Sequence, residues 1–177
     1  MMKGEQKSTG YIHLYTGNGK GKTTAAIGLA VRAVGAGKKV FIGQFVKGMH
    51  YAELESLKRF PEIVIRQYGL DCFIKNKPTQ KDIDAARNGL SEITSIIEKN
   101  MFDMVILDEI CIALYYRLFG VDIVLALLKD KPSEMEILLT GRYAPEEIIK
   151  AADLVTEMKE IKHYYNNGIE ARKGIEY

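Results

Sequence analysis

A glycine-rich stretch near the start of the chain carries the residue types of a phosphate-binding loop. Successive backbone N–H groups in such a turn point into one concavity, and the N-terminus of the following helix adds partial positive charge. A lysine beside the turn supplies a full charge, and a neighbouring hydroxyl can bind Mg²⁺. We therefore expect a polyphosphate site at Gly17, Asn18, Gly19, Lys20, Gly21, Lys22, Thr23 and Thr24. In this site Lys22 would contact phosphate and Thr23 would bind the metal.

This loop is one residue shorter than the usual Walker A motif. That motif places four residues between its first glycine and the Gly-Lys pair. Only three residues stand there in this sequence: Asn18, Gly19 and Lys20. The spacing raises the question whether the loop serves phosphoryl transfer or a different reaction of a nucleotide.

Two acids and an arginine follow other candidate strands. The run MVILDE resembles a Walker B segment and ends in Asp108 and Glu109, and the run EMEILLT leads to Gly141 and Arg142. Ligands of open α/β sheets lie beyond the carboxyl ends of the strands, so both acids should lie near the loop. A carboxylate there can hold Mg²⁺ directly or through water. From the residues alone, Arg142 either clamps phosphate oxygens or forms a surface salt bridge.

The elements that must position these residues alternate between short β-rich runs and helical patterns. This alternation predicts a mostly parallel α/β sheet of about six strands with helices on both faces. The predicted strands are 12–16, 40–45, 63–68, 104–108, 136–140 and 154–158, and the predicted helices are 22–34, 79–99, 121–129 and 144–152. The second helix opens with TQKD, which resembles a capping box. The weakly periodic stretches 47–55 and 162–177 are expected to be loops that line a site.

Length and composition are those of an ordinary soluble protein. The chain has 177 residues, of which 47% are hydrophobic and 27% charged, and a formal net charge of +2. We expect a flexible segment at 1–10 and one domain at 11–177, located in the cytoplasm. The charge does not favour a nucleic-acid partner, and no apolar run approaches the ~20 residues that a membrane-spanning helix needs. The only two cysteines, Cys72 and Cys111, do not suggest a disulfide framework.

Several segments together resemble one family, the ATP:corrinoid adenosyltransferases of the P-loop type, also called cob(I)alamin adenosyltransferases. They extend from about residue 10 to the end of the chain and read TGNGKGKTTAAIGLAVRAVGAGKKV, QFVKG, LDEI, TGR followed by AP after one residue, AADLVTEM and KGIEY. The resemblance implies a P-loop NTPase-like fold. It also implies ATP as co-substrate, Mg²⁺ or alternatively Mn²⁺, and a reduced corrinoid as acceptor.

The family's reaction would account for the short loop. Members of the family hold ATP reversed relative to kinases, so that the ribose 5′ carbon, not the γ-phosphate, faces the corrinoid. Cobalt(I) attacks this carbon and the whole triphosphate leaves. Such a displacement needs all three phosphates bound as one leaving group, whereas a kinase must present the terminal phosphate to an acceptor. The shortened loop would suit displacement at carbon.

The resemblance also assigns roles to individual residues. It places the loop from Gly17 to Thr24 on the triphosphate and implies that Lys22 and Glu109 are catalytic. Metal ligands are implied at Thr23, Asp108 and Glu109, and nucleotide or phosphate contacts at Arg32, Gln44 and Arg142. A flavoprotein electron donor and a homodimer are further implications.

The corrin side departs from the family pattern. Members commonly carry a Gly-Phe-Thr-Trp segment whose aromatic rings press on the corrin and help to remove its lower cobalt ligand. This chain reads GLDCFIKNKP at 69–78 and contains no Trp. Cys72 and Ile74 stand in place of the two aromatics, and Phe73 between them either acts on the corrin or packs in the core.

Four other residues that invite a functional interpretation are expected to be structural. Cys111 should be a small buried hydrophobic residue. Tyr115 and Tyr116 should belong to the core and the rim of the site, and His163 should make a structural hydrogen bond.

Two rival functions share the loop and the acids. A P-loop phosphotransferase or ATP hydrolase would release ADP or orthophosphate, or phosphorylate an acceptor. A non-catalytic carrier would bind ATP and corrinoid without forming a cobalt–carbon bond.

Overall fold

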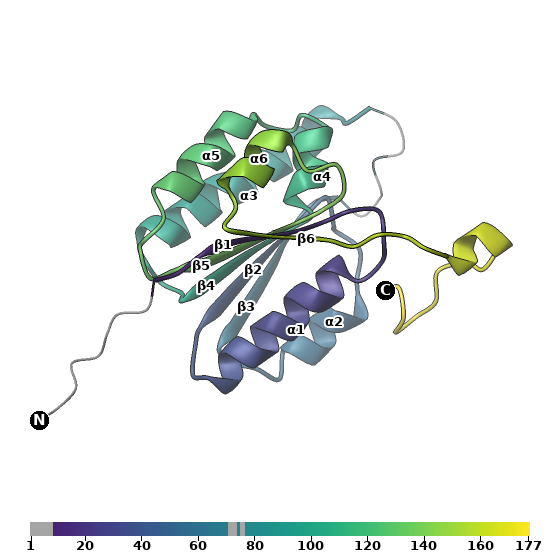
Figure 1. The fold of residues 1–177 in the computed structure, drawn as a ribbon, viewed down its shortest axis with the longest axis horizontal. Coiled ribbons are helices and arrows are strands. Elements are labelled where there is room, and N and C mark those ends of the chain that lie inside the picture. Colours follow the sequence, from purple (N-terminus) through teal and green to yellow (C-terminus); the bar gives the residue numbers. More distant parts are fainter. Residues whose placement is uncertain (1–8, 71–73, 75–76) are drawn as a thin grey trace, which may run out of the picture.

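The β-rich runs of the sequence form one six-stranded sheet in the order β3-β2-β4-β5-β1-β6 (Figure 1). The computed structural model describes residues 9–70, 74 and 77–177. Phe73, Cys72 and most of the expected flexible segment 1–10 therefore lie outside the described residues. Every strand pairing in the described part is parallel, as predicted. The strands are β1 Ile12–Thr16, β2 Val40–Phe45, β3 Ile63–Tyr68, β4 Met104–Asp108, β5 Glu136–Thr140 and β6 Leu154–Glu157.

Helices cover both faces of this sheet. In Figure 1, α1 and α2 lie on one face, and α3, α4, α5 and α6 lie on the other. The helices are α1 Lys22–Gly35, α2 Ala52–Leu57, α3 Gln80–Glu98, α4 Ile110–Tyr115, α5 Val121–Lys129 and α6 Glu146–Ala151, and a 3₁₀ turn, η1, spans Tyr164–Asn167. None of the helices in the described part of the chain is both long and apolar enough to cross a bilayer.

The sequence missed three of these elements. α2 begins inside the stretch 47–55, and η1 lies inside the tail 162–177, where loops were predicted. α4 was also missed, because its six residues ICIALY are almost continuously apolar and show no helical period. The capping box of α3, by contrast, is confirmed: the Thr79 hydroxyl accepts from the Asp82 N–H, and the Asp82 carboxylate accepts from the Thr79 N–H.

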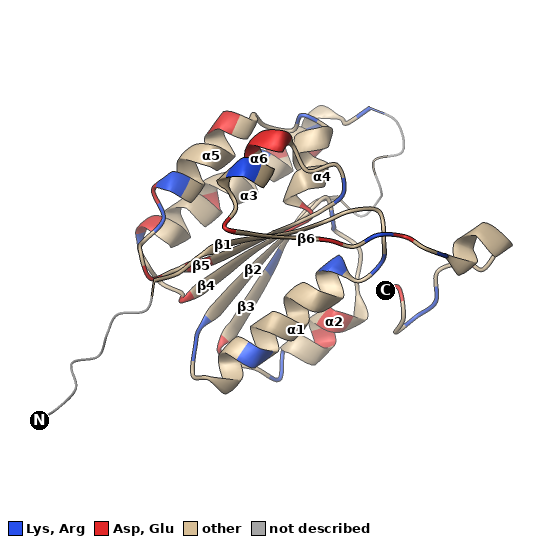
Figure 2. Cartoon of the chain, viewed as in Figure 1, with Lys and Arg blue, Asp and Glu red and all other residues tan. Residues whose placement is uncertain are grey.

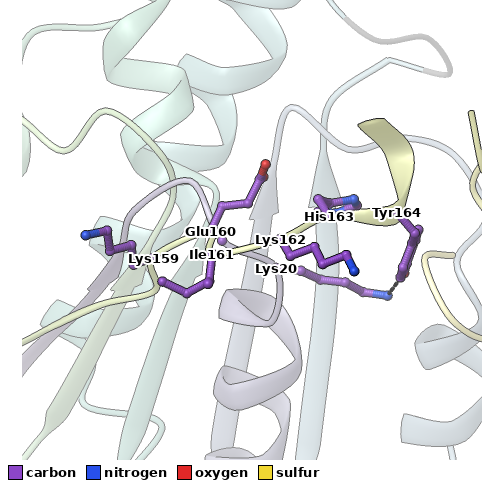
Figure 3. Close-up of a pocket in the computed structure, with 8 residues that line it drawn as sticks. Lys20, Lys159, Glu160, Ile161, Lys162, His163 and Tyr164 are labelled. Carbon is purple, nitrogen blue, oxygen red and sulfur yellow. Dashed lines mark hydrogen bonds between the residues drawn. The ribbon is translucent and has the colours of Figure 1, made fainter. Parts of the chain in front are cut away.

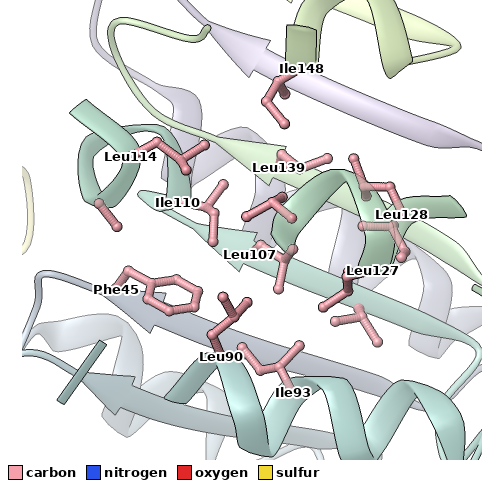
Figure 4. Close-up of a cluster of buried hydrophobic side chains, with 14 of the residues drawn as sticks. Phe45, Leu90, Ile93, Leu107, Ile110, Leu114, Leu127, Leu128, Leu139 and Ile148 are labelled. Carbon is pink, nitrogen blue, oxygen red and sulfur yellow. The ribbon is translucent and has the colours of Figure 1, made fainter. Parts of the chain in front are cut away.

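Two cores hold the layers together. Small side chains of α1, namely Ala26, Ala30 and Ala33, let this helix lie close to the sheet on its face. The larger core on the opposite face joins β2, β4 and β5 to the other four helices (Figure 4). Its labelled members are Phe45, Leu90, Ile93, Leu107, Ile110, Leu114, Leu127, Leu128, Leu139 and Ile148. This packing fixes the carboxyl ends of β1, β2, β4 and β5 at one edge, where the predicted site residues lie.

Candidate active site

The phosphate loop joins the end of β1 to the start of α1 and is pressed against the segment that follows β6. Gly17 and Gly21 have φ angles of 93° and 112°, in the region that favours glycine. A Cβ atom at Gly17 or Gly19 would lie 2.5 or 2.6 Å from the carbonyl oxygen of Met158. The Gly19 N–H donates to that same oxygen at 2.6 Å. These glycines are therefore required by close backbone packing as well as by the turn.

Lys22 folds back into the concavity of the loop. Its Nζ donates to the carbonyl oxygens of Gly17 and Gly19, both at 2.8 Å, and the residue is only 6% exposed. Burial lowers the pKa of this ammonium, while the negative charge of Glu109 acts in the opposite direction. The loop thus holds a positive charge at its centre, as predicted for a phosphate contact.

The Asp108 carboxylate connects the loop to the neighbouring strands by hydrogen bonds. Its Oδ1 accepts from the hydroxyls of Thr23 at 2.9 Å and Thr140 at 2.7 Å. Its Oδ2 accepts from Lys47 Nζ at 2.7 Å and Gln44 Nε2 at 3.2 Å. Burial of this carboxyl raises its pKa, but the Lys47 ammonium and the two hydroxyls outweigh burial and hold the pKa below its ordinary value. Asp108 is therefore an anion that accepts two hydrogen bonds at each of its oxygens.

Glu109 differs from its neighbour in having a carboxylate without a hydrogen-bond partner among the described residues. Its backbone is fixed instead: the N–H donates to the Thr140 hydroxyl at 2.9 Å, and the carbonyl accepts from the N–H groups of Ile112 and Ala113. Burial and the adjacent Asp108 raise the pKa of Glu109, against the charges of Lys47, Lys22 and Arg142. Its carboxylate oxygens thus remain available to a cation near the loop.

Metal binding at this place would need help from the nucleotide. Within the described ranges, no three His, Cys, Asp or Glu side chains gather closely enough to hold a metal ion by themselves. Mg²⁺, however, is commonly bound through one or two carboxylates together with substrate phosphates. The Thr23 hydroxyl and the carboxylates of Asp108 and Glu109 are oxygen donors of the type that Mg²⁺ prefers.

Backbone strain gathers at the same edge of the sheet. Val46, Glu109 and Tyr143 have φ angles of 57°, 59° and 58°, and they follow β2, β4 and β5. Residues other than glycine rarely adopt this conformation, least of all a β-branched one such as Val46. Such residues cluster at functional sites, where the surrounding structure holds them in place.

Most of the predicted site residues come together at this edge, and two further ones join them. Gln44 is fully buried and bonded to Asp108, as described above. Lys47 and Thr140 were not predicted as site residues, although both lie in the quoted segments QFVKG and TGR. The sequence feature that could have identified them is a polar residue at or just beyond the end of a buried strand.

Three other predicted residues differ from this group: Arg32 lies away from it, the Lys20 side chain is bonded elsewhere, and Arg142 lies near it but is exposed. Arg32 is exposed in the last turn of α1, ten residues beyond Lys22 and so about 15 Å along the helix axis. The Lys20 side chain is bonded to Tyr164 and Glu176 of the C-terminal tail. Arg142 is exposed, yet its charge lowers the pKa values of Lys22 and Glu109, which places it close to both.

The residues expected to be structural agree with that interpretation. Cys111 is buried, and burial raises the pKa of its thiol to about 12. Tyr116 packs against the core and donates to the Ile74 carbonyl at 3.1 Å, whereas Tyr115 is exposed and stacks on Tyr143 with ring centroids 4.5 Å apart. His163 accepts from the Tyr165 N–H through Nδ1 at 3.1 Å.

Two solved structures share the fold at low sequence identity. The flagellar accessory protein FlaH from Methanocaldococcus jannaschii matches with a TM-score of 0.62 and 15% identity, over 87% of this chain and 73% of FlaH. The KaiC-like protein PH0186 from Pyrococcus horikoshii OT3 matches with a TM-score of 0.56 and 16% identity, over 87% of this chain and 75% of that one. At such identities the likeness concerns the fold alone, which is that of P-loop NTPases.

Sequence comparison identifies the family as well as the fold. Curated corrinoid adenosyltransferases from Escherichia coli K12, Pseudomonas aeruginosa and Salmonella typhimurium are 34%, 36% and 32% identical to this chain. The alignments cover 97%, 95% and 97% of this chain and 88%, 84% and 88% of those relatives. The family model described as "ATP:corrinoid adenosyltransferase BtuR/CobO/CobP" matches residues 8–177. The chain therefore belongs to the ATP:corrinoid adenosyltransferase family.

Proposed function

We propose that the protein transfers the 5′-deoxyadenosyl group of ATP to the cobalt(I) of a reduced corrinoid and releases triphosphate, as in adenosylcobalamin synthesis. The observation that carries this proposal is the family match over residues 8–177, which includes the phosphate loop and the strand-end acids. ATP and the corrinoid are thus the two substrates. The geometry of the loop supplies the groups that the reaction needs.

In this reaction the electron pair of cobalt(I) forms the new bond to the ribose 5′ carbon. The carbon–oxygen bond to the α-phosphate breaks, and its electron pair leaves with the triphosphate. Negative charge therefore grows on the oxygen nearest the ribose. Lys22 and the backbone N–H groups of the loop stabilise this charge, because they are fixed before the reaction begins. No proton transfer to the nucleophile is required.

We further propose that Thr23, Asp108 and Glu109 hold Mg²⁺, with Mn²⁺ as an alternative. When bound, the ion would neutralise charge on the triphosphate. Asp108 already fixes the Thr23 hydroxyl, whereas Glu109 has free oxygens. Loss of the Glu109 carboxylate should therefore lower the affinity for the metal most directly.

Glu109→Gln tests this assignment. The amide keeps the shape of the side chain but removes the charge, so the Mg²⁺ concentration for half-maximal turnover should rise about tenfold or more. Turnover at saturating ATP is measured against Mg²⁺ concentration, with Glu98→Gln, an exposed acid at the end of α3, as the matched control. Wild-type metal dependence in Glu109→Gln would remove Glu109 from the metal site.

The proposed function is tested by mixing the protein with ATP, Mg²⁺ and chemically reduced cobalamin. The visible spectrum should change to that of an alkylated corrinoid, and phosphorus NMR should show intact triphosphate. Release of ADP or orthophosphate would favour a phosphotransferase or ATP hydrolase. Binding of both substrates without a cobalt–carbon bond would favour a carrier.

Other features remain proposals that the family suggests: the nucleotide contact of Arg32, the corrin contact of Phe73, a flavoprotein electron donor, a cytoplasmic location and a homodimer. A single domain at 11–177 is supported by the one sheet that all six strands share. Association with a second copy is supported by β6, an edge strand whose Leu154 and Val155 are 43% and 42% exposed. Sedimentation equilibrium measures that association.

A further inference from the structure

Four neighbouring strands end in a polar side chain on the face of the sheet that packs against α1. Along most of their length these strands present apolar residues to that helix. The apolar residues are Ile63 and Ile65 of β3, Val40 and Ile42 of β2, Met104 and Ile106 of β4, and Leu138 of β5. Side chains alternate between the two faces of a strand, so the next residue on this face lies two positions further on. In the four strands it is Gln67, Gln44, Asp108 and Thr140, which we call the polar row.

The register of the sheet brings the members of the polar row together. Gln44 is paired with Gln67 of β3 on one side and with Asp108 of β4 on the other. Thr140 of β5 continues the row, because its hydroxyl donates to Asp108 Oδ1. The polar row therefore runs from the edge strand β3 to the centre of the site.

The Asp108 carboxylate determines the direction of the hydrogen bonds in this row. Strand residues are mostly uncharged (Figure 2), and a buried anion such as Asp108, 1% exposed, is costly without hydrogen bonds. An ionised carboxylate can only accept hydrogen bonds. Gln44 must therefore turn its amide N–H groups towards Asp108, as its Nε2 does at 3.2 Å. The carbonyl end of the Gln44 amide then faces β3.

Gln67 supplies the donor that this carbonyl needs. Its Nε2 donates to Gln44 Oε1 at 3.3 Å. Gln44 is fully buried, so bulk water does not reach its amide. If the Gln67 donor were removed, Gln44 Oε1 would stay unsatisfied, or the amide would turn over and present its oxygen to the Asp108 anion. Gln67 thus keeps the Gln44 amide in the orientation that the carboxylate requires.

The same amide group of Gln67 also fixes the loop that carries Lys47, the second donor to Oδ2 of this carboxylate. Gln67 Nε2 donates to the carbonyl oxygen of Met49, two residues beyond Lys47, at 3.0 Å. The loop is closely packed against the segment after β3 as well, since a Cβ atom at Gly48 would lie 2.4 Å from the carbonyl carbon of Leu70. One side chain at the edge of the sheet therefore contacts both Gln44 and the loop of Lys47.

The opposite side of the phosphate loop gives the carboxylate no such support. There a cavity of about 400 Å³ lies between the loop and the segment after β6, and Lys20 in its lining donates to the Tyr164 hydroxyl at 2.9 Å (Figure 3). In the part of the chain that the structure describes, no side chain that donates to Asp108 lines this cavity. The support of Oδ2 therefore comes from the side of β3.

We propose that Gln67 is a positioning residue for the transfer reaction: it orients the Gln44 amide and the Lys47 loop, which hold the Asp108 carboxylate with its Oδ1 on the Thr23 hydroxyl. β3 is separated from β1, which the phosphate loop follows, by β2, β4 and β5, so Gln67 acts through its neighbours. The inference rests on the proposed function, because it takes Thr23 as a ligand of the Mg²⁺ that accompanies ATP.

Hydrogen exchange of the Gln44 side-chain amide tests the orientation without any ligand. The chain has only four glutamines, at positions 6, 44, 67 and 80, and Gln44→Met identifies the Gln44 signal in the spectrum of the ¹⁵N-labelled protein. Gln67→Met keeps the length of the side chain and removes the donor, so the Gln44 amide should exchange about tenfold faster. The backbone N–H groups of β2 should keep their wild-type rates.

Gln67→Glu is a second variant, because it replaces the donor by an acceptor of the same shape, and it should accelerate the same exchange. Wild-type exchange of the Gln44 amide in both variants would overturn the inference. Equal acceleration at the backbone of β2 would also overturn it, because Gln67 would then only stabilise the fold.

An affinity measurement tests the effect on the site. Gln67→Met should weaken the binding of ATP with Mg²⁺ about fivefold by calorimetry, since outer partners of metal ligands affect affinity for the metal. Gln80→Met, at an exposed glutamine that begins α3, is the matched control and should change the affinity less than twofold. In a Gln44→Met background the Gln67→Met loss should be much smaller, because no amide remains to be oriented. Equal losses in both backgrounds would show that Gln67 does not act through Gln44.

These outcomes separate the inference from the proposed function. If Gln67→Met has both effects but the wild-type protein forms no cobalt–carbon bond, the proposed function fails and the positioning role stands. If the wild type forms the bond while Gln67→Met binds ATP with Mg²⁺ as the wild type does, the inference alone fails.

Discussion

Lys22→Ala is expected to slow cobalt–carbon bond formation about 10²- to 10³-fold, the loss seen when one preorganised group that stabilises a developing charge is removed. Lys22 is the positive charge at the centre of the loop, held by the carbonyls of Gly17 and Gly19. The charge on the leaving triphosphate is larger in the transition state than in bound ATP, so the loss should appear in the rate at saturating ATP. Single-turnover reaction with pre-reduced cobalamin measures this step directly.

The fold should survive the Lys22 substitution. Burial already lowers the pKa of this lysine, so its desolvation opposes folding and little stability is expected to depend on it. Lys129→Ala, an exposed lysine at the end of α5, is the control for loss of a lysine as such. A Lys22→Ala protein that unfolds at the same urea concentration as the wild type and reacts at the wild-type rate would remove the loop from the mechanism.

The fold was predictable from the sequence because its central strands are short runs of apolar and β-branched residues. Five of the six strands were predicted with their observed limits, and β6 ends one residue early. The first four residues of β4, Met104 to Leu107, are buried and apolar, as a central strand requires, and the buried acid Asp108 ends the strand. Short helices gave no such signal: α4 is too short and too uniformly buried to show a period.

The site was predictable where a residue type and its place at a strand end determine its role. The loop glycines, Lys22, Thr23 and the two acids meet both conditions. Lys47 could not be assigned in this way, because its partner Asp108 is 61 residues away and only the packing of β2 on β4 brings them together. Lys20 shows the converse: it lies inside the motif, but the tail residue Glu176, 156 positions later, determines where its ammonium goes.

Asp108→Asn is expected to lower the free energy of unfolding by about 3 to 5 kcal/mol, because it leaves the largely buried Lys47 ammonium, whose side chain is 12% exposed, without its counter-charge. The asparagine oxygen can still accept from the hydroxyls of Thr23 and Thr140, but its amide N–H groups would face the ammonium. Urea unfolding measures the loss. The double variant Asp108→Asn with Lys47→Met should be more stable than Asp108→Asn alone, because it contains no buried charge without a counter-charge. A double variant that is no more stable than Asp108→Asn would show that loss of the ion pair is not the cause.

The pH dependence of this difference gives a second test with a definite sign. The pKa of Asp108 is lowered in the folded protein, so its contribution is present above the unfolded value of 3.8 and is lost as pH falls through the folded pKa. The pKa of Lys47 is raised, since the attraction of Asp108 outweighs the effect of burial, so its contribution is lost only as pH rises above the unfolded value of 10.5. In a Glu109→Gln background, which removes the neighbouring acid whose pKa Asp108 raises, the stability loss caused by Asp108→Asn should therefore stay constant between about pH 5 and pH 9. A difference that vanished by pH 6 would show that Asp108 is not held as an anion and could not fix the Thr23 hydroxyl beside the triphosphate.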